Sequence, residues 1–353
     1  MEPLNAFFIA GTQRSGTTLL SVVLGRHPEI DIDGNALAFR LTSVAKLHQE
    51  ILPYNVEHSW PELQGWLIQQ DFKGRMAELF DGIDLEQHGC MQSAIHAAMQ
   101  KRLQQNGKSV FGDKVPDMEH FIPELLMLVP QAKIIHMVRD GRASAASKAK
   151  RAHKTPLLAA QEWVESVTLG LHNQRMLGEN RYKLLRYEDL LQQPEPTVRE
   201  LCGFLSVDFD PAMLNEAPAE NEEKAYVKSA FDPSKIDAYQ QQLSPGQRKA
   251  IERLQAPFLK RFGYELEFPD SLQQHQPMSM GKRLWLRQRS NAKQLFVAKR
   301  QGMTNRETHV VKVSLSSRVK TFLFYLAYDF MPKRAFRRLF RKRFVKQHRY
   351  QKP

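Results

Sequence analysis

The residues that most directly suggest chemistry lie near the N-terminus, in the stretch Gly11-Thr12-Gln13-Arg14-Ser15-Gly16-Thr17-Thr18. An apolar run over residues 6–10 precedes it, as in a short buried strand, and a run typical of a helix follows over 17–25. The N–H groups of such a turn and the positive end of the helix dipole both favour an anion. The spacing of Gly11 and Gly16 is that of a phosphate-binding P-loop, except that Thr17 stands where that loop has lysine.

The missing lysine bears on which anion the loop prefers. In proteins that use ATP or GTP, this lysine neutralises the β- and γ-phosphates and a neighbouring hydroxyl holds Mg²⁺. Here Thr17 and Thr18 offer hydroxyls only, and the cation comes earlier, at Arg14. A planar guanidinium fork suits a doubly substituted anion. The loop therefore favours a nucleotide with a short 5′ anionic group over a triphosphate with its metal.

A second cluster of cations follows the apolar run 133–138, in Arg139-Asp140-Gly141-Arg142-Ala143-Ser144 and the helix-like stretch beyond it. Arg139 leaves the end of the predicted strand, while Ser147 and Arg151, four residues apart, share one face of the helix. The structural alternative is that Arg139 and Arg142 form ordinary ion pairs with Asp140 or Glu188.

Together, the two motifs resemble those of sulfotransferases that use 3′-phosphoadenylyl sulfate (PAPS), in particular tyrosylprotein sulfotransferases and related bacterial enzymes. The resemblance covers roughly residues 6–265 and is weakest over 44–106. It implies transfer of a sulfuryl group from PAPS to a hydroxyl or amine acceptor by in-line displacement, with no metal. The sequence does not name the acceptor, which a glycan, a lipid, a peptide or a small molecule could provide.

The resemblance also assigns roles to residues. It implies that the 5′-phosphosulfate is held by Arg14, Ser15, Gly16, Thr17 and Thr18, the 3′-phosphate by Arg139, Ser147 and Arg151, and that Tyr187 completes the nucleotide site. Lys114, which follows a predicted strand, matches a lysine beside the leaving oxygen, where it would stabilise developing charge. The alternative for Lys114 is a surface lysine.

The general base is a departure from the family pattern. The family usually has a glutamate at a position that falls here on Asn35, and an amide cannot accept a proton from the acceptor. Asp33 could substitute if the loop is shifted, and Asp31, His136 or an acceptor that needs little deprotonation are further alternatives. Both aspartates could equally serve as turn or cap residues, so the base stays open.

A second departure lies before Ser244. The family has a basic residue and usually a tryptophan there, closing over the nucleotide, whereas this chain has Tyr239 with Lys235 four residues earlier. Lys235 is expected either to close on the 3′-phosphate or to be a solvated loop lysine.

The elements that must position these residues alternate along the chain. Apolar runs predict strands at 6–10, 109–112, 133–138 and 182–186, and helical patterns fall near 17–25, 118–128, 141–151, 156–175, 195–205 and 244–262. This order predicts an α/β fold with a P-loop-type parallel sheet flanked by helices on both faces. Residues 44–106 read as helical and polar, and residues 216–243 as a mobile loop. We expect a sulfotransferase-like nucleotide-binding domain over 1–267, and a linker with a helical, basic C-terminal extension over 268–353.

Charge is distributed unevenly along the chain. The net charge is +13, but residues 281–353 hold 21 Lys and Arg against two acidic residues, a net +19, which leaves −6 for the rest. Because residues 1–280 are net acidic, they must bind anions through individual cationic side chains at a defined site and not through a generally basic surface. The two cysteines, Cys90 and Cys202, lack the spacing of a disulfide framework or a zinc site. The first strand leaves no room for a signal peptide, so we expect a cytoplasmic protein.

The basic extension has an apolar segment of its own over residues 322–328, too short to span a bilayer. A cationic stretch follows, in which Phe336, Phe340 and Phe344 recur every four residues. This combination favours peripheral contact with an anionic membrane. Packing on the body or on a second subunit is the next alternative, and nucleic-acid contact is the least favoured.

Two other classes of function remain open. A P-loop kinase would need lysine at Thr17 and a metal-binding aspartate, which Asp140 could imitate after its strand. A catalytically silent protein that binds PAPS or its product would be consistent with Asn35.

Overall fold

The computed structural model describes residues 4–33, 82–83, 87–88, 91–114, 117–151, 154–215 and 231–300. Several of the predictions fall outside these residues. They concern Asn35, Cys90, the helical stretch before residue 82, most of the loop that begins at residue 216, and the apolar and cationic segments beyond residue 300.

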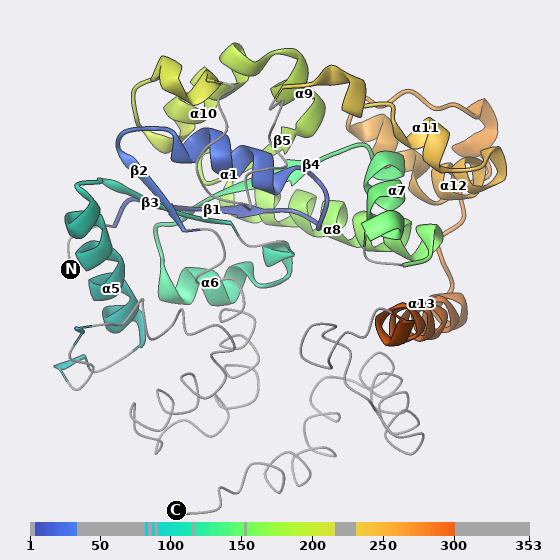
Figure 1. The fold of residues 1–353 in the computed structure, drawn as a ribbon, viewed down its shortest axis with the longest axis horizontal. Coiled ribbons are helices and arrows are strands. Elements are labelled where there is room, and N and C mark those ends of the chain that lie inside the picture. The colour runs from blue at the N-terminus through green and yellow to red at the C-terminus, as the bar shows by residue number, and fades with distance from the viewer. Residues whose placement is uncertain are drawn as a thin grey trace, which may run out of the picture. The chain divides into compact units, whose positions relative to one another are not determined.

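A five-stranded parallel sheet forms the centre of the protein (Figure 1). Its strands are β1 (Ala6–Ala10), β2 (Ile30–Asp33), β3 (Val110–Lys114), β4 (Lys133–Val138) and β5 (Tyr182–Arg186), in the order β2-β3-β1-β4-β5. The strands predicted at 6–10, 133–138 and 182–186 are confirmed, and β3 is shifted to include Lys114. Sequence reasoning missed β2.

Helices cover both faces of the sheet (Figure 1). Their bounds are α1 Thr17–Gly25, α5 Met91–Asn106, α6 Ile122–Leu128, α7 Gly141–Arg151, α8 Pro156–Leu177, α9 Tyr187–Gln192, α10 Pro194–Leu205, α11 Tyr239–Gln242, α12 Pro245–Arg261 and α13 Met280–Arg300. Short 3₁₀ helices span Met118–His120 (η3), Pro211–Leu214 (η4), Pro233–Lys235 (η6) and Pro269–Ser271 (η7).

The core follows from the alternation of side chains along the strands. Phe8 of β1 faces α5 and α6, whereas Phe7 and Ile9 face α1 and α10, and all three are fully buried. A strand buried on both sides needs an unbroken apolar run, which is what residues 6–10 provide. Each fully buried phenylalanine contributes about 1.5–3 kcal/mol of stability.

Two helical predictions gain detail. The helix expected over 118–128 is two pieces, η3 and α6, with the break at Phe121, whose φ of −131° is not helical. Pro123 lies in the first turn of α6, where a helix tolerates proline. The helix expected from Ser244 is confirmed, with Ser244 and Gln247 forming a capping box.

The parallel strands fix where the candidate residues lie. The carboxyl ends of parallel strands share one edge of a sheet, which is where ligands bind in such folds. The loop from Gly11 to Gly16 follows β1, Lys114 ends β3, Arg139 follows β4 and Tyr187 follows β5. All four strands therefore deliver candidate residues to the same edge.

Residues up to Ser290 belong to the compact unit that holds the sheet, and the chain beyond forms a second unit. The division predicted after residue 267 stays a prediction. Among the described helices, none combines the length and the apolar character needed to cross a bilayer. Cys202 is buried with a free thiol.

Candidate active site

A cavity of about 460 Å³ opens at the carboxyl edge of the sheet. Its walls are Arg14, Gly16, Thr17, Thr18, Leu19, Arg139, Ala143, Ser147, Lys150, Arg151, Tyr187, Lys235, Ala238, Tyr239 and Gln242. The two sequence motifs, more than a hundred residues apart, thus line one cavity. A direct contact joins them, since Arg14 donates from Nε to Ser147 Oγ over 3.1 Å.

The loop has a backbone that only certain residues adopt. Gly16 caps α1 with φ of 105°, in the left-handed region that favours glycine. A Cβ at Gly16 would also lie 2.3 Å from Cδ2 of Tyr187, so the ring and the loop are in close contact. Arg14 has φ of 74°, an uncommon value for a residue with a side chain. Since α1 begins at Thr17, its first N–H groups lack partners within the helix, as at an anion site.

Polar groups outside the cavity form hydrogen bonds with the first residues of this loop. Glu119 Oε2 accepts the Gly11 N–H at 3.0 Å, and the Asp117 N–H donates to the Gly11 carbonyl at 3.0 Å. One residue along, Lys148 donates from Nζ to the Thr12 hydroxyl. These contacts fix the loop without entering the cavity.

Glu119 is buried and belongs to a polar cluster that includes His136. Burial alone would raise the pKa of Glu119, but the nearby His136 and the hydrogen bond from Ser166 lower it, and the net shift is downward. His136 is itself fully buried, and its Nδ1 lies 2.7 Å from the Tyr182 hydroxyl. His136 is not among the wall residues of the cavity, and its role as an alternative base stays a prediction.

The far end of the cavity is built around Arg139. Its guanidinium lies 4.5 Å from the centre of the Tyr187 ring, and its terminal nitrogen donates to the Lys235 carbonyl at 2.9 Å. Arg139 Nε is buried and has no hydrogen-bond partner among the described residues, and the same is true of Ser15 Oγ. Ser15, although a residue of the loop, is fully buried and is not among the wall residues of the cavity.

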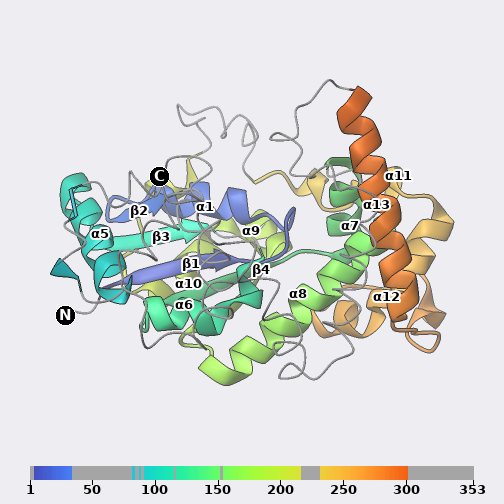
Figure 2. The ribbon, with the colours of Figure 1, turned by 90° about the horizontal axis from the view of Figure 1, so that it is seen from below.

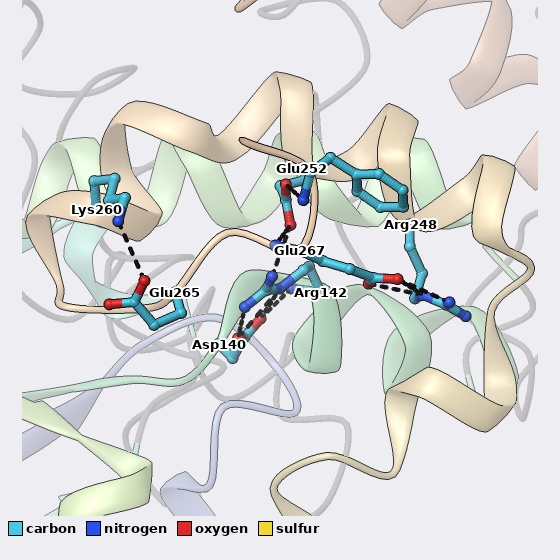
Figure 3. A network of polar contacts seen from close by, with 8 residues as sticks. Asp140, Arg142, Arg248, Glu252, Lys260, Glu265 and Glu267 are labelled. Carbon is cyan, nitrogen blue, oxygen red and sulfur yellow. Dashed lines mark hydrogen bonds and ion pairs between the residues drawn. The ribbon is translucent and has the colours of Figure 1, made fainter. Parts of the chain in front are cut away.

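Arg142 has a different role, the one named as the structural alternative. It is buried between Asp140 and Glu252, with contacts of 2.7 Å to each carboxylate (Figure 3). Burial alone would lower the pKa of Arg142, but the hydrogen bonds and charge of Asp140 outweigh it and raise the pKa. Glu252 also accepts the backbone N–H groups of Glu267 and Phe268, each at 2.8 Å. Arg142 therefore ties α7 to α12 and the segment after it.

Glu188 sets the position of Arg139 relative to Tyr187. Glu188 follows Tyr187 and accepts the N–H of Asp140, which follows Arg139, at 2.9 Å. The Tyr264 hydroxyl donates to its second oxygen at 2.8 Å. Burial raises the pKa of the Glu188 carboxyl. The hydrogen bond between Asp140 and Glu188 thus keeps their neighbours stacked.

Lys114 ends β3 beside the loop helix. Its Nζ lies 3.5 Å from the Thr18 Oγ1, and the side chain is mostly buried. The structure thus places Lys114 next to a wall residue of the cavity, and the alternative of an exposed surface lysine is wrong.

Most of the residues that line the cavity lie in a segment that matches a known protein family. A model described as the Sulfotransferase family matches residues 6–211, more than half of the chain. The chain belongs to the sulfotransferase family. The matched segment contains the loop, β4, Arg139 and Tyr187, and enzymes of this family are PAPS-dependent.

Individual relatives of this sulfotransferase are distant. Protein-tyrosine sulfotransferase of Drosophila melanogaster is 28% identical over 220 residues, covering 59% of this chain but only 39% of that protein. Protein-tyrosine sulfotransferase 1 of Danio rerio is 24% identical over 281 residues, covering 73% of this chain and 72% of that protein. Among solved structures, the sulfotransferase domain of the Synechococcus PCC 7002 olefin synthase is similar, with a TM-score of 0.52 and 25% identity, covering 75% of this chain and 97% of that chain.

The candidates for the general base in this sulfotransferase lie in different surroundings. Asp33 ends β2, paired in register with Asp113 of β3. Asp31, on the same strand, is held by Arg102 at 2.6 Å and Asn106 at 2.9 Å, which fixes it against α5. Asn35 lies outside the described residues.

Sequence reasoning missed part of the cavity wall. Lys150 follows Ser147 by three residues on α7, and this helical spacing was a usable signal. Gln242 and Ala238 gave no signal, because their place depends on how α11 returns to α7. Lys235 and Tyr239, both singled out from the sequence, do line the cavity. The Tyr239 ring lies 5.3 Å from the Arg142 guanidinium.

Proposed function

We propose that this sulfotransferase binds PAPS in the cavity and transfers its sulfuryl group to a hydroxyl or amine acceptor by in-line displacement. The 5′-phosphosulfate lies against Arg14, Thr17, Thr18 and the N–H groups that open α1. The 3′-phosphate lies against Arg139, Ser147 and Arg151, with Tyr187 between the two ends.

The observation that carries this proposal is the charge of a single cavity. Five cationic side chains line it, and no carboxylate is among its described wall residues; the cations are Arg14, Arg139, Lys150, Arg151 and Lys235. A ligand with anionic groups at two ends fits such a wall, because guanidinium and ammonium groups form charge-assisted hydrogen bonds with phosphate and sulfate oxygens. Arg139 Nε, which has no hydrogen-bond partner among the described residues, supplies further hydrogen-bonding capacity at the end proposed for the 3′-phosphate.

The residues around the cavity support a simple division of chemistry. The acceptor oxygen or nitrogen attacks sulfur, and the bond from sulfur to the bridging phosphate oxygen breaks. Lys114, beside Thr18, stabilises the charge that develops on that oxygen. Asp33 is the proposed acceptor of the proton. Its backbone pairs with Asp113, the neighbour of Lys114, so both residues end strands at the same edge.

The kinase alternative is less well supported. Asp140, the aspartate that could have held a metal, is 5% exposed and ion-paired with Arg142 at 2.7 Å. Its carboxylate also accepts the Arg142 backbone N–H at 2.8 Å. A carboxylate engaged in this way is not available to Mg²⁺ without losing the buried pair.

Two measurements test the proposal. Isothermal titration with adenosine 3′,5′-bisphosphate is expected to show binding, whereas ATP with Mg²⁺ is expected to bind more weakly and not to be turned over. Transfer of labelled sulfate from PAPS is then measured on mixed acceptors, beginning with tyrosine peptides because two relatives are named for that substrate. Binding without transfer to any acceptor would favour the catalytically silent alternative, and absence of binding would overturn the assignment.

A further inference from the structure

The first half of α13 has a defined inner face. Leu286 is 5% exposed, and the Thr155 N–H donates to Ser290 Oγ at 3.1 Å. Arg283 forms an ion pair with Glu165 of α8 at 3.0 Å. Figure 2 shows the ribbon of α13 alongside the N-terminal part of α8. These contacts determine which side chains of the helix point away from the body.

The outer face combines an aromatic residue with positive charge. Trp285 is 57% exposed, one of the few large apolar side chains exposed among the described residues. The Arg289 guanidinium lies 5.3 Å from its ring, one turn along the helix. Lys282 is exposed one turn before Trp285, on the same side of the helix. Over its full length, α13 contains seven Lys and Arg and no acidic residue.

We propose that this face of α13, centred on Trp285 with Lys282 and Arg289, binds the surface of an anionic phospholipid membrane. Indole rings favour the headgroup level of a bilayer, where the ring is partly buried and its N–H stays hydrated. Lysine and arginine side chains lay their apolar stems along such a surface and reach the lipid phosphates.

The charge distribution of the chain favours an anionic partner at this end. Residues 281–353 carry a net charge of +19, against −6 for the residues before them. An anionic surface therefore attracts the end that begins with α13 and repels the body. A bilayer fits better than a polynucleotide because the face has a single indole within a cationic stripe, without the series of aromatic side chains on which successive bases stack.

The test uses the full chain and vesicles of two compositions, phosphatidylcholine alone and phosphatidylcholine with 25 mol% phosphatidylglycerol. We expect co-sedimentation with the mixed vesicles only, weakening as NaCl rises. Brominated phosphatidylcholine in the mixed vesicles is expected to quench part of the tryptophan fluorescence of the wild type. This quenching should be missing in Trp285→Phe. This difference isolates Trp285 from the other three tryptophans of the chain.

A charge-matched pair of variants separates this face from general attraction. Lys282→Gln with Arg289→Gln is expected to lower vesicle partitioning about 25-fold, from about fivefold for each cation near the surface. The control, Arg175→Gln with Lys260→Gln, makes the same change in net charge on α8 and α12 and is expected to have a much smaller effect. Unchanged melting temperatures would show that both proteins are folded.

Three results would overturn the proposal. The first is no preference for anionic vesicles. The second is vesicle binding without quenching of Trp285, which would assign the contact to residues beyond α13. The third is a change in Trp285 fluorescence on adding RNA that vesicles do not produce, which would assign a nucleic-acid surface.

Discussion

Replacing Gly16 by alanine should damage both the stability of the protein and its nucleotide site. The backbone at Gly16 has φ of 105°, and a left-handed conformation costs a residue with a Cβ about 1–2 kcal/mol. The new methyl would lie 2.3 Å from Cδ2 of Tyr187, far inside the usual carbon–carbon separation. Forcing a methyl into a packed site costs about 1–3 kcal/mol. We therefore expect the free energy of unfolding to fall by about 2–5 kcal/mol.

The affinity for the nucleotide should fall as well. The Tyr187 ring must move to admit the methyl, and Arg139 stacks on that ring at 4.5 Å. A displaced Arg139 would lose a charge-assisted hydrogen bond of about 1.5–3 kcal/mol, so affinity for adenosine 3′,5′-bisphosphate should fall at least roughly tenfold.

Urea denaturation and titration calorimetry measure the two effects. The control is Gly203→Ala in α10, where nothing lies within 4 Å of the added Cβ and stability should be unchanged or higher. Adding Tyr187→Ala to Gly16→Ala removes the clash, so the double variant should be more stable than the sum of the single losses by about 1–3 kcal/mol. Wild-type stability and affinity in Gly16→Ala would refute the reasoning.

Three further predictions follow from the site. Lys114→Ala should lower kcat by about 10²–10³ while affinity for adenosine 3′,5′-bisphosphate changes little, and equal losses in both would contradict its role at the leaving oxygen. Arg142→Met leaves Asp140 and Glu252 buried without their cation, so urea denaturation should show a loss of about 3–5 kcal/mol; a loss below about 1 kcal/mol would argue against the network. Burial raises the pKa of Tyr239 to about 12, so this hydroxyl ionises at lower pH in the unfolded chain than in the folded protein. The free energy of unfolding should therefore fall as pH rises from 10 towards 12. Tyr239→Phe should lessen this fall, and absorbance at 295 nm can follow the ionisation.

The parts of the fold that the sequence predicted are those fixed by local pattern. Residues 6–10 and 133–138 are unbroken apolar runs, as expected of strands buried on both faces. The missed strand β2 is Ile30-Asp31-Ile32-Asp33, half of whose residues are aspartates at an edge of the sheet. Its acidic character is tolerated because Arg102 of α5 neutralises Asp31, a partner 71 residues away. No local pattern contains that information.

The same distinction applies to the site. Arg14 and Arg139 could be predicted to meet because each follows a strand, and parallel strands deliver their ends to one edge. The contacts that hold the loop could not, since Glu119 meets Gly11 across 108 residues and Lys148 meets Thr12 across 136. The different roles of Arg139, which lines the cavity, and Arg142, which forms a buried ion pair, could not be predicted from the sequence either. The difference depends on Glu252, a buried carboxylate of α12 that forms an ion pair with Arg142.

The central claim is that one end of the cavity recognises a 3′-phosphate through Arg139. Titration calorimetry of adenosine 3′,5′-bisphosphate and of adenosine 5′-monophosphate, on the wild type and on Arg139→Ala, tests it most directly. We expect the wild type to prefer the bisphosphate by roughly 10- to 150-fold, the range of one charge-assisted hydrogen bond. Arg139→Ala should lose most of that preference, whereas Arg199→Ala, an exposed arginine of α10, should keep it. Equal affinity of the wild type for both nucleotides, or an unchanged preference in Arg139→Ala, would contradict the claim.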